Sequence, residues 1–132
     1  MPTLQLQLTP AQPAPRIAAL ARGLTALSTR ILGKREELTA LLLEEIVASR
    51  WFIGGEPPQR PTARLEISIT AGTNTVEEKD AFIAAAFREL QQQLGPLEEA
   101  SYVVVRELPA TDWGYGGRTQ AARRLASLSI AA

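Results

Sequence analysis

The sequence contains no cysteine and no histidine among its 132 residues. A disulfide framework, a zinc site of the usual kind and a cysteine nucleophile are therefore excluded. The serine–histidine–aspartate triad and any histidine acid–base pair are excluded as well. Any catalysis must come from carboxylates, arginine, lysine, tyrosine, hydroxyl groups or a terminal amine.

An excess of charge of either sign is also missing, because 14 lysine and arginine residues balance 14 aspartate and glutamate residues. We therefore expect no general electrostatic attraction to nucleic acid or to an anionic membrane. No apolar stretch approaches the roughly 18 residues of a membrane span, and the N-terminus lacks the pattern of a signal peptide. The composition, with 45% hydrophobic residues, predicts a single cytoplasmic domain with a substantial core.

Two parts of the sequence match each other at a spacing of 62 residues. The stretch WFIGG at 51–55 recurs as WGYGG at 113–117, and Leu32-Gly33 recurs as Leu94-Gly95. The opening Pro2-Thr3 matches Pro61-Thr62 at a slightly different spacing, which a small insertion explains. We therefore predict an internal repeat. Its parts are the units 2–56 and 61–117, a proline-rich connector at 56–61 and a tail at 118–132.

The pattern of the first unit predicts a strand, a helix and a second strand. Leu4, Leu6 and Leu8 alternate with polar residues, the period of a strand with one buried face. An apolar stripe at helical spacing follows and ends before Gly33, a residue suited to a left-handed cap; the stripe comprises Ile17, Leu20, Leu24, Leu27 and Ile31. Segment 35–49 is rich in helix-forming residues, but its partner in the repeat has the composition of a strand. We predict a strand there against local propensity.

The second unit repeats this plan. Thr75 and Glu78 have the spacing of a capping box at the start of a helix, and the expected apolar stripe comprises Ile83, Phe87, Leu90 and Leu94. The β-branched run within 101–108 is typical of a buried strand. Two tandem β-α-β units predict an α+β fold, with a four-stranded sheet and two helices on one face. The other sheet face needs a partner, which favours an oligomer.

The tail at 118–132 carries Arg118, Arg123 and Arg124. Three arginines without interleaved aromatic residues are weak support for nucleic-acid binding. We expect this tail to contact another subunit.

Several of these features together resemble the 4-oxalocrotonate tautomerase superfamily. They are a proline at position 2, a β-α-β unit, and an aromatic-x-x-Gly-Gly turn after the second strand. The resemblance covers almost the whole chain, from Pro2 to about Gly117, as two fused copies of the family's small subunit with a tautomerase-like, or MIF-like, fold. Asp112-Trp113 is similar to a segment of malonate semialdehyde decarboxylase, a longer member that, like the dehalogenases, forms trimers.

The resemblance implies chemistry at Pro2. In this family the initiator methionine is removed and the prolyl nitrogen acts as general base or acid, without metal or cofactor. An α-amino group titrates near neutral pH, and desolvation favours its neutral form further. The resemblance therefore implies an isomerase, a homotrimer that catalyses keto–enol tautomerisation of a small carboxylate, an enolisable 2-oxo acid.

The sequence departs from the family where arginines hold the substrate. The first of these places carries Gln12 and Asn74 in the two units, and the second carries Ala40 and Tyr102. The arginine pair that the decarboxylase and dehalogenase members carry before the second helix is also missing from 70–74. An alternative function follows: a divergent member with hydration chemistry, or a non-catalytic structural or interaction protein.

An acidic substrate needs a replacement cation. Arg106 is the first candidate for substrate binding, because Tyr102 and Arg106 share one face of a strand by alternation. Arg16 and Arg50 are weaker candidates. For each arginine the alternative is a solvated residue or an ion pair at the surface or an interface.

The two tryptophans occupy equivalent positions in the repeat. Trp113 is expected to form an aromatic wall facing Pro2, with a core or interface role as the alternative. Trp51 would face Pro61, whose nitrogen lies inside a peptide bond and is no base. We therefore expect Trp51 to be structural.

Overall fold

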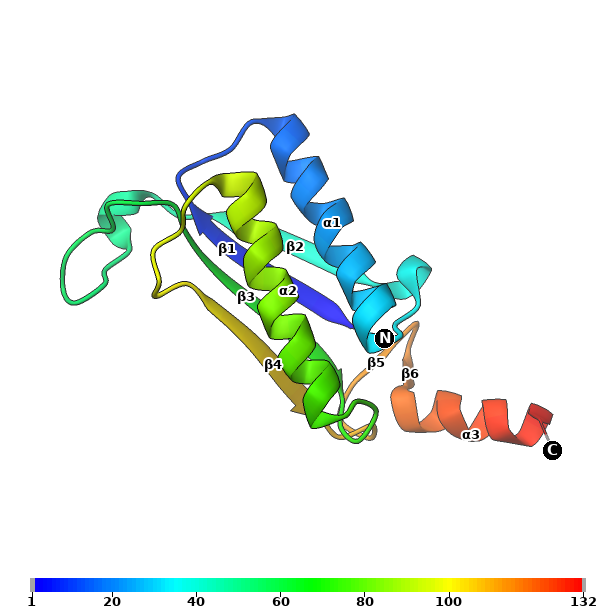
Figure 1. Cartoon of the computed structure of the whole chain (residues 1–132). Helices are drawn as coiled ribbons and strands as arrows, with labels where there is room; N and C mark the ends of the chain where they lie inside the picture. The colour runs from blue at the N-terminus through cyan, green and yellow to red at the C-terminus, as the bar shows by residue number, and fades with distance from the viewer. Residues whose placement is uncertain (1, 132) are drawn as a thin grey trace.

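The computed structural model describes residues 2–131 and contains a four-stranded sheet with two long helices on one face (Figure 1). The first unit supplies β1 (Thr3–Thr9), α1 (Ala14–Leu32) and β2 (Ala40–Glu45). The second supplies β3 (Thr62–Thr70), α2 (Val76–Leu94) and β4 (Tyr102–Leu108). The strand order is β2-β1-β3-β4. This architecture confirms the predicted α+β fold of tandem β-α-β units.

The pairing of the strands joins the two units head to tail. Within each unit the strands are parallel, whereas β1 and β3 run antiparallel, with Thr3 opposite Ser68 and Thr9 opposite Thr62. The start of β1 therefore lies beside the end of β3, and the start of β3 beside the end of β1. We call the end of the sheet where β1 starts and β3 ends the Pro2 end, and the opposite end the Pro61 end.

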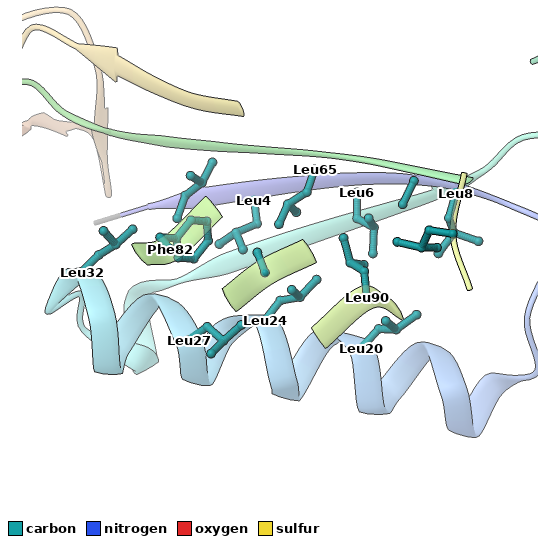
Figure 2. Close-up of a cluster of buried hydrophobic side chains, with 14 of the residues drawn as sticks. Leu4, Leu6, Leu8, Leu20, Leu24, Leu27, Leu32, Leu65, Phe82 and Leu90 are labelled. Atoms are coloured by element: carbon teal, nitrogen blue, oxygen red, sulfur yellow. The ribbon is translucent and has the colours of Figure 1, made fainter. Parts of the chain in front are cut away.

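The core lies between the sheet and the two helices (Figure 2). Alternate residues of β1 and β3 point toward the helices and are fully or almost fully buried: Leu4, Leu6, Leu8, Leu65, Ile67 and Ile69. Helix α1 covers them with Leu20, Leu24 and Leu27. Burial of each such side chain is worth roughly 1.5–3 kcal/mol, so this layer stabilises the fold.

The buried face of α2 differs from the predicted one. Phe82, Ala86 and Leu90 are fully buried, whereas Ile83 is exposed and Phe87 only partly buried. Packing against α1 and the sheet buries the helix face centred on Phe82, one residue away from the predicted stripe. Leu90 belongs to the buried face as predicted.

The segment 35–49 forms a strand at its centre, as predicted against local propensity. It contains β2, flanked by short 3-10 helices at Glu36–Leu38 and Ala48–Arg50. Strand β2 pairs with β1, with Leu4 opposite Leu41 and Leu6 opposite Leu43. Leu41 and Leu43 then pack against the core, and this packing outweighs the helix preference.

The sheet face away from the helices carries a charged row beside exposed apolar residues, among them Leu42 and Tyr102. Glu66 lies between Arg64 and Arg106, at 3.1 Å and 3.6 Å from their guanidinium nitrogens. The Glu66 side chain is only 13% exposed, so both arginines screen a carboxylate that is largely removed from water. We call this surface the open face.

The chain ends in a segment that extends away from the sheet and helices (Figure 1). A short hairpin of β5 (Gly114–Tyr115) and β6 (Arg118–Thr119) leads into α3 (Gln120–Ala131). The Arg123 guanidinium lies 3.9 Å from the centre of the Tyr115 ring, and Arg123 donates hydrogen bonds to the Tyr115 carbonyl. Of the helices described, none is long and apolar enough to cross a membrane.

Helix α2 begins with the capping box that the sequence predicted. The Thr75 hydroxyl accepts a hydrogen bond of 3.0 Å from the Glu78 amide, and the Glu78 carboxylate accepts one of 2.8 Å from the Thr75 amide. The second bond, together with a side-chain bond from Asn74, lowers the pKa of Glu78 below its usual range.

We predict that Thr75→Ala lowers the free energy of unfolding by about 0.5–2 kcal/mol, because it leaves a helical amide without its acceptor. Urea denaturation of both proteins measures the difference.

We predict that Glu78→Gln also destabilises the folded protein at neutral pH. A carboxyl with a lowered folded-state pKa stabilises the fold above its unfolded pKa, and this contribution disappears as the pH falls through the folded value. Urea denaturation should therefore show the difference between wild type and Glu78→Gln shrinking between pH 7 and about pH 3. A difference independent of pH would contradict this assignment.

Candidate active site

Pro2 is buried immediately before β1, which lies between β2 and β3 in the sheet. Its carbonyl accepts a hydrogen bond of 3.4 Å from the Ala40 amide at the start of β2. Because Thr3 pairs with Ser68, the register brings Pro2 beside Ile69 on β3. The first residue after the initiator methionine is therefore held by strands on both sides. Met1, whose removal the resemblance implies, lies outside the described residues.

Trp113 lies at the same end of the sheet as Pro2. Its indole Nε1 donates a hydrogen bond of 3.2 Å to the Thr70 hydroxyl. Thr70 is the last residue of β3 and is only 7% exposed. The bond therefore fixes the indole next to the strand end that adjoins Pro2.

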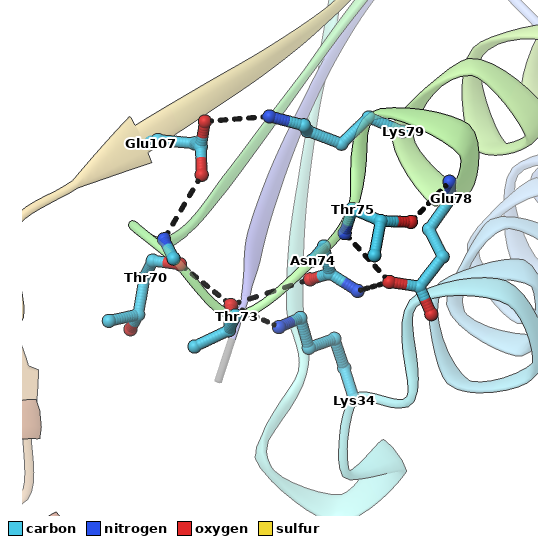
Figure 3. A network of polar contacts seen from close by, with 9 residues as sticks. Lys34, Thr70, Thr73, Asn74, Thr75, Glu78, Lys79 and Glu107 are labelled. Carbon is cyan, nitrogen blue, oxygen red and sulfur yellow. Dashed lines mark hydrogen bonds and ion pairs between the residues drawn. The ribbon is translucent and has the colours of Figure 1, made fainter.

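Lys34 is a buried cation at this end, and sequence reasoning did not identify it. It follows Gly33, whose left-handed conformation (φ 70°) turns the chain at the end of α1. Its Nζ donates a hydrogen bond of 3.0 Å to the Thr73 hydroxyl, which itself donates one of 2.6 Å to the Thr70 carbonyl (Figure 3). Lys34 is thus joined through Thr73 to the strand end that holds Trp113.

A further hydrogen bond explains why Lys34 is held against this loop. The Asn74 side-chain amide donates to the Leu32 carbonyl at 3.0 Å, which ties the end of α1 to the turn after β3. Asn74, at a position where the resemblance implies a substrate-binding arginine, therefore makes a structural contact. The only sequence signal for Lys34 is a lysine directly after a helix-ending glycine, and this pattern occurs in many surface turns.

The electrostatics of the Pro2 end depend on burial and on two carboxylates. Lys34 is only 9% exposed, and this burial lowers the pKa of its ammonium group, while Glu78 and Glu107 act in the opposite direction. An ion pair of 2.8 Å with Lys79 and a hydrogen bond from the Gly72 amide lower the pKa of Glu107. The Pro2 end therefore combines ionised carboxylates with a lysine that loses its proton more easily than usual.

The structure places Arg106 on the open face. It pairs across the strands with Ser68, which in turn pairs with Thr3, so it is close to the Pro2 end along the sheet. Its side chain is 62% exposed and contacts Glu66. This contact is the ion pair with a nearby carboxylate that is the alternative to substrate binding at Arg106.

The other three candidates lie at the Pro61 end of this chain. Arg16 is in the first turn of α1, and its guanidinium donates to the Gln93 carbonyl. Arg50 ends the 3-10 helix that follows β2. Tyr102 begins β4, opposite Arg64, and is 56% exposed. Of the predicted site residues, Pro2 and Trp113 therefore lie at the Pro2 end and Arg106 lies along the sheet from it, whereas Arg16, Arg50 and Tyr102 lie at the Pro61 end.

The two ends of the sheet have equivalent backbones, but the hydrogen bond between a threonine hydroxyl and a tryptophan indole is not made at both of them. Thr9 ends β1 as Thr70 ends β3, and Trp51 corresponds to Trp113 in the repeat. Thr9 is 1% exposed, and its hydroxyl has no hydrogen-bond partner within residues 2–131. The threonine–tryptophan bond is therefore made at the Pro2 end and missing at the Pro61 end.

Tandem β-α-β units with a proline at the first strand define a class of fused small-subunit proteins, and comparison with known proteins places the chain within it. Residues 36–116 match the model of a family described as tautomerase enzyme. The chain belongs to this family, as a fused member of the 4-oxalocrotonate tautomerase superfamily. No curated protein sequence matches it significantly.

Solved structures agree with this assignment. A native fused 4-OT is 31% identical, with a TM-score of 0.80, over 91% of this chain and 97% of that one. A fused 4-OT described as an asymmetric trimer is 29% identical, with a TM-score of 0.83, over 92% and 98% of the two chains. A protein described as inactivated by 2-oxo-3-pentynoate shares the fold at 19% identity, with a TM-score of 0.84 over 92% and 98%.

The two equivalent threonines provide a matched test of the indole hydrogen bond. Thr70→Val removes the acceptor of Trp113 and should lower the free energy of unfolding by about 1 kcal/mol. Thr9→Val removes a buried hydroxyl that has no partner within residues 2–131 and should leave stability unchanged or raise it. Urea denaturation of both variants measures the difference. Equal destabilisation by the two substitutions would show that the bond to Trp113 contributes nothing.

Proposed function

We propose that this protein is a tautomerase in which the N-terminal amine of Pro2 transfers a proton on a small enolisable 2-oxo acid. The observation that supports this most directly is the composition of the Pro2 end. A buried proline that becomes a free secondary amine after methionine removal lies at the same strand end as an indole and a buried ammonium group. The chemistry then consists of taking a proton from one atom of the substrate and returning it to another.

The physical environment of Pro2 favours its neutral, basic form. Burial disfavours the charged state of an amine, so a larger fraction is unprotonated at neutral pH. Strands β2 and β3 hold the residue on both sides, which limits the directions in which the ring nitrogen points. The Trp113 indole supplies an apolar surface against which a planar enol packs.

Lys34 is our candidate for the cation that replaces the missing arginines. An ammonium group held among buried residues interacts more strongly with a substrate carboxylate or enolate oxygen than one in water. Its hydrogen bond to Thr73 uses one of three N–H donors, which leaves donors for a substrate. Arg106 is less suited to this role in the isolated chain, because it contacts Glu66 on the open face.

We further propose a cytoplasmic homotrimer as the working form. The open face carries Glu66 and its two arginines, no element among residues 2–131 covers it, and a related structure is described as a trimer. In a trimer, Arg106 or Tyr102 of one chain has the opportunity to approach the Pro2 end of another.

The alternative is a family member that kept the fold without catalysis. It is favoured by Asn74, which binds the Leu32 carbonyl at a position where the family carries a substrate-binding arginine. A retained Met1 would block the Pro2 amine and support this alternative. Intact-mass analysis of the purified protein distinguishes the two, because removal of one methionine is required only for catalysis.

We predict that Pro2→Ala lowers the turnover of phenylenolpyruvate by about 100-fold, within the range that a positioned general base contributes. The reagent 2-oxo-3-pentynoate, an electrophilic 2-oxo acid, should add to the neutral amine of the wild type and raise the mass of the N-terminal peptide. Protein with an acetylated N-terminus should not be labelled there. Unchanged turnover in Pro2→Ala would rule out this mechanism.

We predict that Lys34→Met lowers kcat/KM for the same substrate by about 10- to 100-fold, the loss expected for a hydrogen bond to a charged group. Stability in urea should not fall, because methionine fills the site without the desolvation of an ammonium group. Lys79→Met is the matched control: it removes another cation at this end, one that is ion-paired with Glu107. Equal losses of activity in both variants would show a general charge effect and not a contact from Lys34.

A further inference from the structure

Helix α2 has a second apolar face that its own core leaves uncovered. Packing buries the face centred on Phe82, so Ile83 stays 38% exposed and Phe87 is only partly buried. Together with Val103 of β4, these two residues line a hollow of about 480 Å³ beside this edge strand of the sheet. The hollow lies on the helix side of the sheet and not on the open face. Apolar side chains gathered at a surface hollow are typical of a docking site.

Helix α3 carries a second apolar surface that is exposed. Leu125 and Leu128 lie one turn apart, and they are 66% and 58% exposed. Within residues 2–131, the hydrogen bonds that join α3 to the preceding segment and hairpin all involve residues 120–123. A helix of 12 residues is marginal in water by itself. The turns beyond residue 123 therefore need a surface against which to pack.

The hollow and α3 lie at different ends of the same chain. Strand β4 runs parallel to β3, so it starts at the Pro61 end, where Ser101 and Val103 line the hollow. Helix α3 follows the Trp113 segment at the Pro2 end and points away from the sheet and helices (Figure 1). The hydrogen bonds of residues 120–123 fix this direction. Helix α3 is therefore directed toward a neighbouring molecule and not toward the hollow of its own chain.

The two surfaces match in length and in charge. The hollow extends along about two turns of α2, and residues 120–128 form about two and a half turns of α3. Glu99 is the acidic residue of the lining, and Arg124 is exposed next to Leu125. Residues 120–128 contain no acid, so Arg124 has an opposite charge in the lining and meets none in its own helix. Arg88, the cation of the lining, is exposed and directs its charge to water.

We propose that the hollow between α2 and β4 receives α3 from a second copy of this chain. The two leucines of α3 pack against Ile83 and Phe87, and Arg124 pairs with Glu99 at the rim. This inference rests on the proposed oligomer and identifies a contact between its chains that lies outside the open face. It does not depend on the proposed chemistry at Pro2.

The chain contains no cysteine, so introduced thiols report this contact directly. Differently tagged Ile83→Cys and Leu125→Cys chains, co-expressed and mildly oxidised, should form a covalent dimer of unlike chains, because a disulfide requires Cα atoms within about 7 Å. Val76→Cys is the matched control, since Val76 is 72% exposed on the same helix but does not line the hollow. Its cross-linking to Leu125→Cys should be at least about tenfold slower.

A charge reversal tests the pair at the rim. Glu99→Lys or Arg124→Glu alone should slow the cross-linking of Ile83→Cys to Leu125→Cys, and the two reversals together should restore its rate. The effect of each single reversal should shrink as salt is added, because exposed charges are screened. Single reversals without effect at low salt, or no recovery in the double reversal, would contradict the pairing of Arg124 with Glu99.

Analytical ultracentrifugation of the wild type separates this proposal from that of the oligomer. An oligomer whose folded cysteine variants, checked by circular dichroism, do not cross-link overturns the docking of α3 and leaves the oligomer standing, whereas a monomer overturns both. Docking is also overturned if Val76→Cys cross-links as fast as Ile83→Cys, or if Leu125→Cys chains cross-link mainly to each other. A disulfide that forms within one chain of the Ile83→Cys/Leu125→Cys double variant would likewise rule out a second copy as the occupant.

Discussion

The antiparallel pairing of β1 with β3 is the contact on which the rest of the structure depends. It places Leu4 opposite Ile67 and Leu6 opposite Leu65, so that one continuous apolar layer forms under both helices. A single β-α-β unit has two strands and cannot bury its helix. The same pairing sets the start of each unit's first strand beside the end of the other unit's first strand. Fold stability and the position of Pro2 therefore have a common origin.

Duplication leaves the two ends of the sheet alike in backbone and different in chemistry. Only Pro2 is able to become a free amine, because Pro61 follows a peptide bond. The end that holds Pro2 also has the threonine–tryptophan hydrogen bond and the buried Lys34. The other end keeps a buried Thr9 hydroxyl without a partner within residues 2–131. This orphaned group indicates that the Pro61 end no longer has to hold its indole in one orientation.

Much of the fold follows from local patterns in the sequence, and less of the site does. Alternation in 4–8, the Gly33 cap and the Thr75 capping box depend on neighbouring residues and were predictable. The strand at 40–45 was predictable only from the repeat, because its own composition favours a helix. The stripe on α2 and the burial of Lys34 depend on which side chains other elements bring close, and one-dimensional spacing does not contain that information. Alternation puts Arg106 on one strand face with Tyr102, but its contact with Glu66 depends on the register of β3 and β4.

The lysine that we propose in place of the arginines implied by the resemblance would change what the Pro2 end is able to recognise. Arginine offers a planar fork that binds a carboxylate through two parallel hydrogen bonds, whereas lysine is a compact charge on a flexible stem. A single ammonium group therefore discriminates less by shape. It also loses charge more readily, because burial lowers the pKa of Lys34. Binding of an acidic substrate raises that pKa again by direct charge attraction. In the proposed site, the Lys34 ammonium group would therefore be stabilised most when an anionic substrate is bound beside it.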